Sequence, residues 1–249
     1  MTVFLFRAQS HDDPDEYQLA LTQQGYDVHF IPVLEHALES IAHLAELMSK
    51  APMHTCLVIT SQRAVESWAA AKTQATSIHP QWHDLQLYIV GSKTAEQLCD
   101  LSFFSRQPIV ASRATELAPL IVADRPESIL FLAGDKRRDV LPDCMAEANI
   151  PMLEIQAYKT CMHPQLEDHL NSLTYTKGDW FVLFSPSGVD YIKQLGKHPM
   201  LASCKLAAIG PTTSDHLQQM GLAVHAVAEK PRASFIADAI VAYDQQQQQ

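Results

Sequence analysis

Two turns in the sequence combine glycine, hydroxyl side chains and backbone amides in a way that suits the binding of an anion. They are Gly91-Ser92-Lys93-Thr94 and Gly210-Pro211-Thr212-Thr213, and each lies between a short apolar run and a helical pattern. At a helix N-terminus the free backbone N–H groups point outward, and the helix dipole favours negative charge there. The chemistry indicated is the binding of carboxylates or phosphates. The alternative is that these Ser and Thr residues only cap their helices, which contributes about 1 kcal/mol each.

Two further turns place serine after an apolar run. They are Thr60-Ser61-Gln62-Arg63 and Ser185-Pro186-Ser187-Gly188. A third strand-end position, Gly134-Asp135-Lys136-Arg137-Arg138, is the densest basic cluster of the chain. Arg63, Lys93 and Lys136 could hold acidic groups of a ligand, and the alternative is that they are solvated surface residues.

The sequence lacks the familiar patterns that bind nucleotides or form a covalent intermediate. It has no Gly-x-Gly-x-x-Gly fingerprint, no Gly-Lys-Ser/Thr phosphate loop and no Gly-x-Ser-x-Gly elbow. Its five cysteines are spread singly, without the close pairs typical of zinc sites, and its 12 histidines are scattered. We therefore predict no metal, no organic cofactor and no covalent mechanism.

Composition narrows the partners and the compartment. A net charge of −10 argues against nucleic-acid binding, because phosphate contacts need a concentrated basic face. It does not exclude a small anionic ligand, because loops and helix ends set the local potential. The longest apolar runs are far shorter than the roughly 20 residues that span a bilayer. We expect a cytoplasmic monomer that binds a small molecule and no membrane.

The secondary-structure pattern predicts an α/β protein. Short apolar runs alternate with longer helical patterns, as is typical of parallel strands covered by helices on both faces. The predicted strands are residues 3–6, 28–31, 56–60, 87–90, 129–132, 152–155, 180–184, 206–209 and 223–226.

An internal repeat relates the two halves. The turn at Gly91 corresponds to the turn at Gly210, an offset of 119 (210 − 91), and the same offset places Arg113 on Arg232. A second pair relates the turns at Ser61 and Ser185. A third relates the first strand and its helix to residues 129–132 and the helix that follows.

The repeat has a consequence for the domains. If the first unit joins the last two, a discontinuous domain of residues 1–33 and 162–244 surrounds an inserted domain of residues 36–157. The run Gln245 to Gln249 reads as a disordered low-complexity tail.

The order of these motifs resembles the uroporphyrinogen-III synthase family. The resemblance spans nearly the whole chain and rests on residues 26–34, 60–66, 90–95, 154–160, 184–188 and 207–213. It implies two flavodoxin-like parallel-sheet domains, one discontinuous, joined by a two-stranded connector with the active site in the interdomain cleft. It also implies that hydroxymethylbilane, a linear tetrapyrrole, is cyclised and dehydrated to uroporphyrinogen III. Ring D is inverted through a spiro intermediate, without a cofactor, as a step of haem biosynthesis.

The resemblance also implies residue roles. Tyr158 is similar to the family tyrosine proposed to assist loss of the substrate hydroxyl, and a phenol with an ordinary pKa of about 10 can donate a proton at neutral pH. The alternative is that Tyr158 only packs. The substrate-binding residues expected on these grounds are Thr60, Ser61, Arg63, Gly91, Ser92, Lys93, Thr94, Gly134, Lys136, Ser185, Pro186, Ser187, Gly188, Gly210, Pro211, Thr212 and Thr213.

A second function stays open at this point. A non-catalytic binder or sensor of an anionic metabolite would use the same architecture, because a fold does not fix a function. Formation of the type III isomer from hydroxymethylbilane distinguishes the two, since the linear substrate closes without enzyme to the type I isomer.

Overall fold

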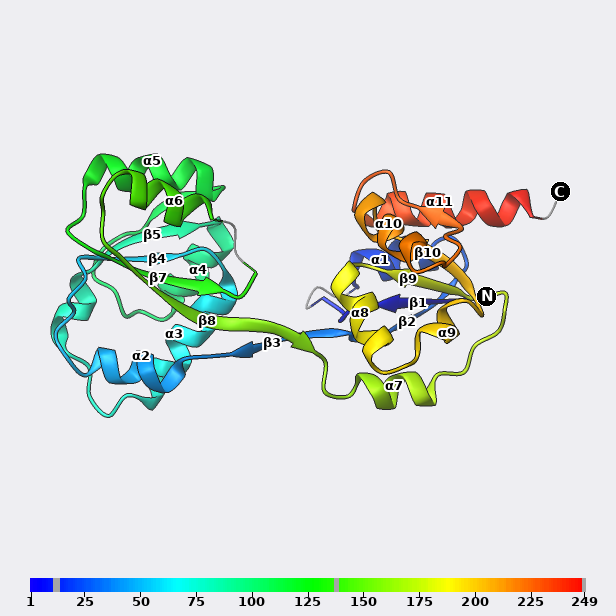
Figure 1. Cartoon of the computed structure of the whole chain (residues 1–249), viewed down its shortest axis with the longest axis horizontal. Coiled ribbons are helices and arrows are strands. Elements are labelled where there is room, and N and C mark those ends of the chain that lie inside the picture. Colours follow the sequence, from blue (N-terminus) through cyan, green and yellow to red (C-terminus); the bar gives the residue numbers. More distant parts are fainter. Residues whose placement is uncertain (11–13, 137–138, 248–249) are drawn as a thin grey trace. The chain divides into compact units, whose positions relative to one another are not determined.

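The computed structural model describes residues 1–10, 14–136 and 139–247. The chain divides into two compact units (Figure 1). The first, which we call the terminal unit, consists of Met1–Glu35 and Cys161–Gln249, and the second, the central unit, of His36–Thr160. Each unit contains a sheet flanked by helices.

The terminal unit contains a five-stranded sheet whose order is β11-β10-β9-β1-β2, with every neighbouring pair parallel. The sheet places β1 beside β9 although the strands lie far apart in the sequence, with Val3 opposite Trp180. The strands are β1 (Thr2–Phe6), β2 (Asp27–Phe30), β9 (Trp180–Leu183), β10 (Lys205–Ala208) and β11 (Ala226–Val227). The helices are α1 (Glu16–Thr22), α7 (Leu166–Ser172), α8 (Pro186–Gln194), α9 (His198–Leu201), α10 (Pro211–Gln219) and α11 (Ala233–Gln246).

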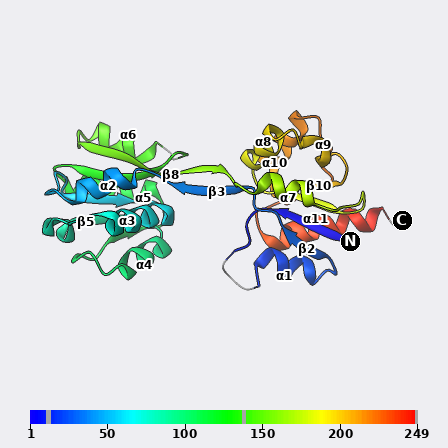
Figure 2. The same ribbon diagram turned by 90° about the horizontal axis from the view of Figure 1, so that it is seen from below.

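Alternation along β1 supplies both faces of this sheet. Phe4 and Phe6 pack with residues of α7, α8 and α10, whereas Val3 and Leu5 pack with residues of α1 and α11. Figure 2 shows α1 and α8 on opposite faces of the sheet. Successive side chains of a strand point to opposite faces, so a continuous apolar run is what a strand covered on both sides requires.

The central unit contains a six-stranded sheet whose order is β3-β8-β7-β4-β5-β6. The pairs from β8 to β6 are parallel. The strands are β3 (Leu34–Leu38), β4 (Cys56–Ile59), β5 (Gln86–Val90), β6 (Ile109–Ala111), β7 (Ile129–Gly134) and β8 (Met152–Met162). The helices are α2 (Ile41–Met48), α3 (Gln62–Gln74), the 3-10 helix η1 (Pro80–Asp84), α4 (Ser92–Asp100), α5 (Ala114–Asp124) and α6 (Val140–Glu147).

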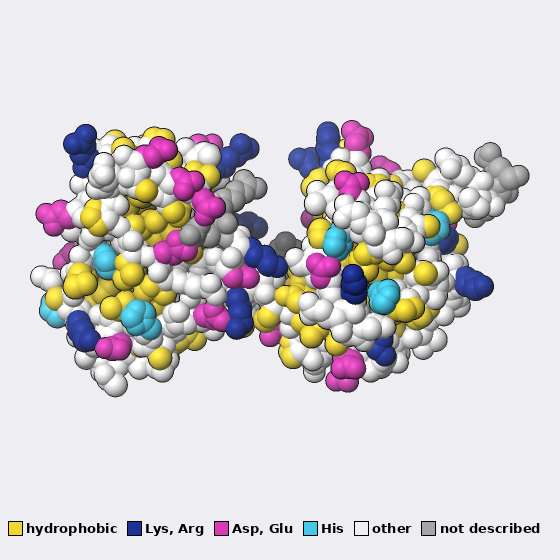
Figure 3. All heavy atoms as spheres, in the orientation of Figure 1, with side chains coloured by type: hydrophobic (Ala, Val, Ile, Leu, Met, Phe, Trp, Pro, Cys, Tyr) yellow, Lys and Arg dark blue, Asp and Glu magenta, His cyan; other side chains and the backbone are white. Residues whose placement is uncertain are grey.

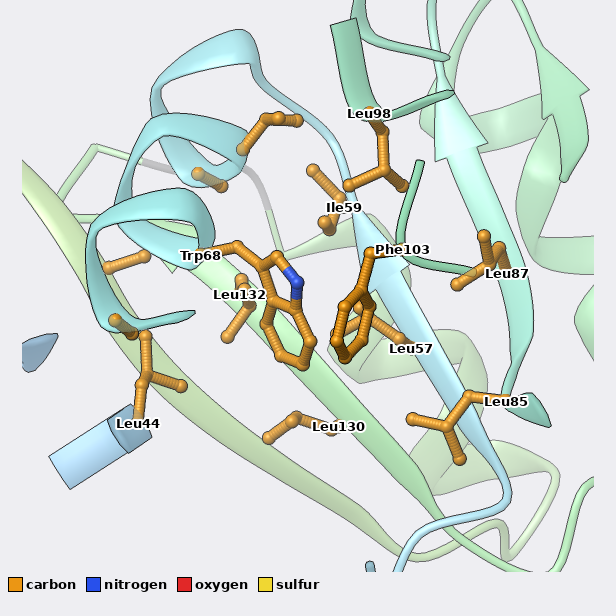
Figure 4. Packing of buried hydrophobic residues seen from close by; sticks show 14 of the residues in the cluster. Leu44, Leu57, Ile59, Trp68, Leu85, Leu87, Leu98, Phe103, Leu130 and Leu132 are labelled. Atoms are coloured by element: carbon orange, nitrogen blue, oxygen red, sulfur yellow. The ribbon is translucent and has the colours of Figure 1, made fainter. Parts of the chain in front are cut away.

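The indole of Trp68 lies at the centre of one core of this unit. It projects from α3 toward leucines of β4 and β7, and Phe103 lies beside it with the ring centroids 6.0 Å apart (Figure 4). Trp68 is fully buried. The opposite face of the sheet packs against α5 and α6 through Leu117 and Met145. Aromatic side chains of this size contribute much of the area buried in a core, so α3 is held firmly against the strands that carry the candidate site.

Strand β3 lies beside β8, and the two strands run antiparallel, as two hydrogen bonds between them and their flanking residues show. The Glu39 amide donates to the Ala157 carbonyl at 2.7 Å, and the His163 amide donates to the Val33 carbonyl at 2.9 Å. The boundaries between the two units fall inside these strands.

The structure confirms the α/β class with parallel sheets and differs from the sequence prediction in several elements. Strands β3 and β6 were not among the predicted strands, because Glu35 and His36 interrupt the apolar residues of β3 and β6 has only three residues. The last predicted strand begins later, at Ala226. Helix α11 continues through Gln246 into the stretch expected to be disordered, because glutamine is a good helix former and extending a helix is easier than starting one.

Among the described residues, no helix combines the length and the apolar character needed to cross a membrane.

Candidate functional site

The repeated turns are helix N-termini at strand ends, as their positions in the sequence predict. Gly91 precedes α4 and Gly210 precedes α10, each directly after a parallel strand. Ser61 and Ser185 are the N-caps of α3 and α8, with nearly the same extended backbone. The carboxyl ends of parallel strands meet at one edge of a sheet. Each unit therefore carries its turns along one edge.

In the central unit, strand register defines the order of the residues along that edge. Ile59 of β4 lies opposite Leu132 of β7, and Gly134 of β7 lies opposite Tyr158 of β8. Because the turns follow β4 and β7 closely, the structure brings Gly134 and Ser61 together at neighbouring strand ends, beside Tyr158, which lies within β8. The turn at Gly91 follows on the next strand, β5.

Tyr158 is half-buried at this edge and is held from several sides. Its carbonyl accepts from the Asp135 amide at 3.1 Å, and its ring meets the His36 imidazole edge to face, with centroids 5.8 Å apart. The ring also lies against Gly134, where an added Cβ would be 2.6 Å from Tyr158 Oη. The Oη atom makes no hydrogen bond with any other residue that the structure describes.

The turn at Ser61 is a helix cap with a charged neighbour. Ser61 Oγ accepts from the Arg63 amide at 3.1 Å. The Arg63 guanidinium binds both carboxylate oxygens of Glu66, at 2.7 and 2.9 Å. Thr60 is half-buried between strand and cap. Capping therefore accounts for Ser61, and Arg63 already has an acidic partner.

The turn at Gly91 has an exposed part and a buried part. Ser92 and Lys93 are exposed, whereas Thr94 is only 6% exposed. Gly91 has a φ of 89°, which favours glycine. Beside this turn lies an open surface pocket of about 560 Å³, lined by Gly91, Ser92, Val110, Ala111, Ser112, Glu116 and Leu120.

The turn after β7 contributes charge of both signs. Gly134 is buried, and Asp135 and Lys136 are exposed. Arg137 and Arg138, part of the predicted basic cluster, lie outside the described residues. Partial loss of hydration lowers the pKa of His36, and the nearby Arg63 guanidinium lowers it further. The imidazole beside Tyr158 is therefore neutral at neutral pH.

The terminal unit carries the matching turns. Ser185 Oγ accepts from the Gly188 amide at 3.1 Å, and a Cβ added to Gly188 would lie 3.5 Å from Val33. Pro186 occupies the first turn of α8, and Ser187 is half-buried next to it. In the other turn Pro211 and Thr212 are exposed and Thr213 is 3% exposed, following the buried Gly210.

Thr94 and Thr213 are both predicted to contact substrate, and both are buried in the structure. Both stand third in their helices. Thr94 Oγ1 lies 3.6 Å from the position of a Cβ on Gly91, so its hydroxyl faces the start of its own helix. The exposed groups of the two turns are Ser92, Lys93, Pro211 and Thr212.

Sequence reasoning missed three residues around Tyr158. Ser67 is fully buried, and its hydroxyl donates to the Ala157 carbonyl at 2.6 Å. His36 comes from β3, and the Asp135 carboxylate accepts from the Thr160 amide at 3.0 Å. A serine inside the apolar face of α3 was the one available signal, because a buried hydroxyl needs a partner.

Charge is mixed on the surface. Figure 3 shows Lys and Arg side chains interspersed with Asp and Glu side chains on the visible face of each unit. Within the described part of the chain, no group of three or more His, Cys, Asp and Glu residues is arranged to hold a metal ion.

The fold and the strand-end turns place this chain among α/β proteins whose ligands bind beyond the carboxyl ends of parallel strands. The family model described as "Uroporphyrinogen-III synthase HemD" matches residues 15–237. The chain belongs to this family.

Named relatives agree with this assignment. Uroporphyrinogen-III synthase of Schizosaccharomyces pombe is 27% identical over 240 residues, covering 93% of this chain and 93% of that protein. The Saccharomyces cerevisiae protein of the same name is 28% identical over 256 residues, with 92% of each chain covered.

Solved structures share the fold. Uroporphyrinogen-III synthetase of Helicobacter pylori matches with a TM-score of 0.61 and 18% identity, over 97% of this chain and 99% of that chain. A mutant uroporphyrinogen III synthase of Thermus thermophilus matches with a TM-score of 0.51 and 14% identity, over 99% of each chain.

Proposed function

We propose that this protein converts hydroxymethylbilane to uroporphyrinogen III. The observation that carries the proposal is the family match across residues 15–237, a range that includes every strand-end turn and Tyr158. Loss of the substrate hydroxyl as water leaves an electrophilic methylene carbon, which bonds to the substituted carbon of ring D. In the spiro intermediate the bond between that ring D carbon and the methylene bridge to ring C breaks, the freed methylene carbon bonds to the unsubstituted α-carbon of ring D, and loss of the proton from that carbon completes the macrocycle with ring D inverted.

The main task of such an enzyme is to hold one flexible polycarboxylate in one folded shape. Proximity and orientation of the reacting groups alone can supply a large part of the decrease in activation free energy. The exposed groups Ser92, Lys93, Lys136 and Thr212 are proposed to bind substrate carboxylates, together with the amides of the helix N-termini. The other strand-end residues are proposed to shape these turns, since Ser61 and Ser185 cap helices and Thr94 and Thr213 are buried.

Tyr158 is proposed as the proton donor to the departing hydroxyl. Its half-buried ring is fixed within β8, beside the end of β7, and its Oη is not engaged by any residue described in the structure. A positioned proton donor contributes roughly 10² to 10⁴-fold in rate.

The alternative, a non-catalytic binder of an anionic metabolite, is disfavoured by the family match. We further propose that the protein acts as a cytoplasmic monomer without a nucleic-acid partner. Size-exclusion chromatography with light scattering tests the oligomeric state.

The decisive experiment is single-turnover formation of the type III isomer by Tyr158→Phe. Phe keeps the ring and removes the donor, so we expect a rate lower by roughly 10² to 10⁴-fold with an unchanged melting temperature. Tyr175→Phe, a half-buried tyrosine of the terminal unit, is the matched control and should retain the rate. A nearly full rate for Tyr158→Phe would show that the phenol is not the donor. Formation of only the type I isomer by the wild-type protein would exclude the synthase activity itself.

A further inference from the structure

Gly134 and Tyr158 meet at an irregularity in the central sheet. Ala133 of β7 lies opposite Gln156, but the next residue, Gly134, lies opposite Tyr158. Ala157 is therefore an extra residue on β8, which makes a β-bulge. Bulges re-aim side chains and are frequent next to active sites.

The bulge is fixed by hydrogen bonds from two other elements. The Ala157 carbonyl accepts from the Glu39 amide at 2.7 Å, and from the buried Ser67 hydroxyl of α3 at 2.6 Å. Ala157 itself is fully buried. Because β8 cannot slip here without losing these bonds, the direction of the Tyr158 side chain is set by the backbone.

The Tyr158 ring, which follows the bulge on β8, lies directly across Gly134. A Cβ on Gly134 would be 2.6 Å from Tyr158 Oη and also too close to ring carbons. Tyr158 Oη would have to move by about 0.8 Å to bring that 2.6 Å distance to 3.4 Å, the lower limit of ordinary contact, and Tyr158 Cζ, which is nearer, would have to move further. The φ of Gly134 is not in the left-handed region. The space taken by Tyr158, and not backbone strain, therefore requires glycine at this position.

His36 makes a second contact with the same ring. The imidazole meets the phenol edge to face, and His36 Nδ1 lies 3.4 Å from Thr160 Oγ1. The charged groups that act on this imidazole are Arg63, Glu66, Asp135 and Lys136. With its lowered pKa, His36 packs on the ring as a neutral aromatic side chain.

We propose that Gly134 and His36 are positioning residues that hold the Tyr158 phenol in its reactive orientation, Gly134 through the absence of a side chain. The proposal rests on the proposed role of Tyr158 and assigns to Gly134 a function other than binding substrate. It does not concern the other strand-end turns.

The test is a double-mutant cycle of Gly134→Ala and Tyr158→Phe in single-turnover and steady-state assays. Misplacement of a reacting group by about 1 Å can cost roughly 10²-fold, so Gly134→Ala should lower kcat by about 10 to 100-fold and change KM by less than about threefold. In the Tyr158→Phe background the same substitution should change kcat by less than about twofold, because no donor is left to misplace. The matched control is Gly178→Ala, since a Cβ there meets only Thr176 Oγ1, at 3.8 Å.

Fluorine NMR of protein labelled with fluorotyrosine separates this proposal from the proposed function. The signal missing in Tyr158→Phe identifies Tyr158, and it should shift in Gly134→Ala. The Tyr158 signal should also shift in His36→Ala and should return to its wild-type position in His36→Phe. In the control His43→Ala, which changes an exposed histidine of the same unit, the signal should keep its wild-type position. The His36 variants provide the readout if Gly134→Ala does not fold.

An unmoved signal in both Gly134→Ala and His36→Ala would overturn the positioning of the ring. If Gly134→Ala lowered kcat equally in the wild-type and Tyr158→Phe proteins, the proposal that Gly134 acts through the Tyr158 phenol would be overturned. A shifted signal together with full activity of Tyr158→Phe would mean that Gly134 and His36 do contact the Tyr158 ring. It would refute the role of Tyr158 as proton donor, and with it any effect on catalysis of positioning the ring.

Discussion

Removing the carboxylate of Asp244 should destabilise the terminal unit strongly. This carboxylate lies near the end of α11 and is buried. One oxygen accepts from Tyr26 Oη at 2.8 Å and from Trp180 Nε1 at 3.0 Å, and the other pairs with Lys205 Nζ at 2.5 Å. Asp244 thus connects the last helix to β9, to β10 and to the residue before β2.

The magnitude follows from what is left behind. Asp244→Ala leaves the buried Trp180 N–H and the Lys205 ammonium without their acceptor, and breaking a buried ion pair costs about 3–5 kcal/mol. Asp244→Asn keeps an amide oxygen for Tyr26 and Trp180 but places an NH₂ group against Lys205, so we expect about 1–3 kcal/mol. The matched control is Asp238→Ala on the exposed side of α11, which should stay within about 0.5 kcal/mol of wild type.

The pH dependence has a defined sign. Burial alone would raise the pKa of Asp244, but donation from Lys205, Trp180 and Tyr26 holds the pKa below its ordinary value. A depressed carboxyl pKa stabilises the fold above the unfolded value and loses that contribution as the pH falls through the folded value. The advantage of wild type over Asp244→Asn should therefore be full at neutral pH and shrink in strong acid.

The assay is urea unfolding followed by fluorescence and circular dichroism, repeated from neutral to acidic pH. Equal free energies of unfolding for Asp244→Ala and Asp238→Ala would refute the reasoning. So would an advantage over Asp244→Asn that does not change with pH.

Three further predictions concern the site and its chemistry. Lys93→Ala should raise KM for hydroxymethylbilane about threefold to tenfold with little change in kcat, because an exposed charge contributes mainly to binding; Lys193→Ala, at the far end of α8, should change neither. Burial raises the pKa of the Cys56 and Cys204 thiols to about 12, so a thiol reagent at mildly alkaline pH should label the exposed Cys99 and spare both, and rapid labelling of either in the folded protein would contradict this. Exhaustive chelation should leave the synthase activity intact, and a loss that added zinc or magnesium restores would disprove the cofactor-free reaction.

Much of the fold could be predicted because its signals are local. The continuous apolar run at residues 3–6 identifies β1, and Gly25 and Asn149, residue types that favour the left-handed conformation after a helix, have φ values of 84° and 55°. The capping serines and the glycine at position 91 were recognisable from their immediate neighbours. In each case the physical cause acts over a few residues of the chain.

Burial and pairing of the candidate side chains could not be predicted in the same way. Arg63 and Lys93 look alike in the sequence, but Arg63 binds Glu66 one helical turn away and Lys93 is exposed. Thr94 and Thr213 are predicted to contact substrate, and the structure adds that both are buried within the first turn of their helices. Which face of a helix meets the sheet decides this, and that face depends on the whole packed layer.

The sequence by itself determined most of the strands and helices, the repeated helix starts and the family. Only the tertiary structure decided that β1 lies beside β9, that β3 borders β8, and that the bulge at Ala157 turns Tyr158 across Gly134. The reason is physical. Caps and apolar periods depend on neighbours along the chain, whereas register and a close approach such as Gly134 to Tyr158 depend on hydrogen bonds between segments that become neighbours only when the sheet has formed.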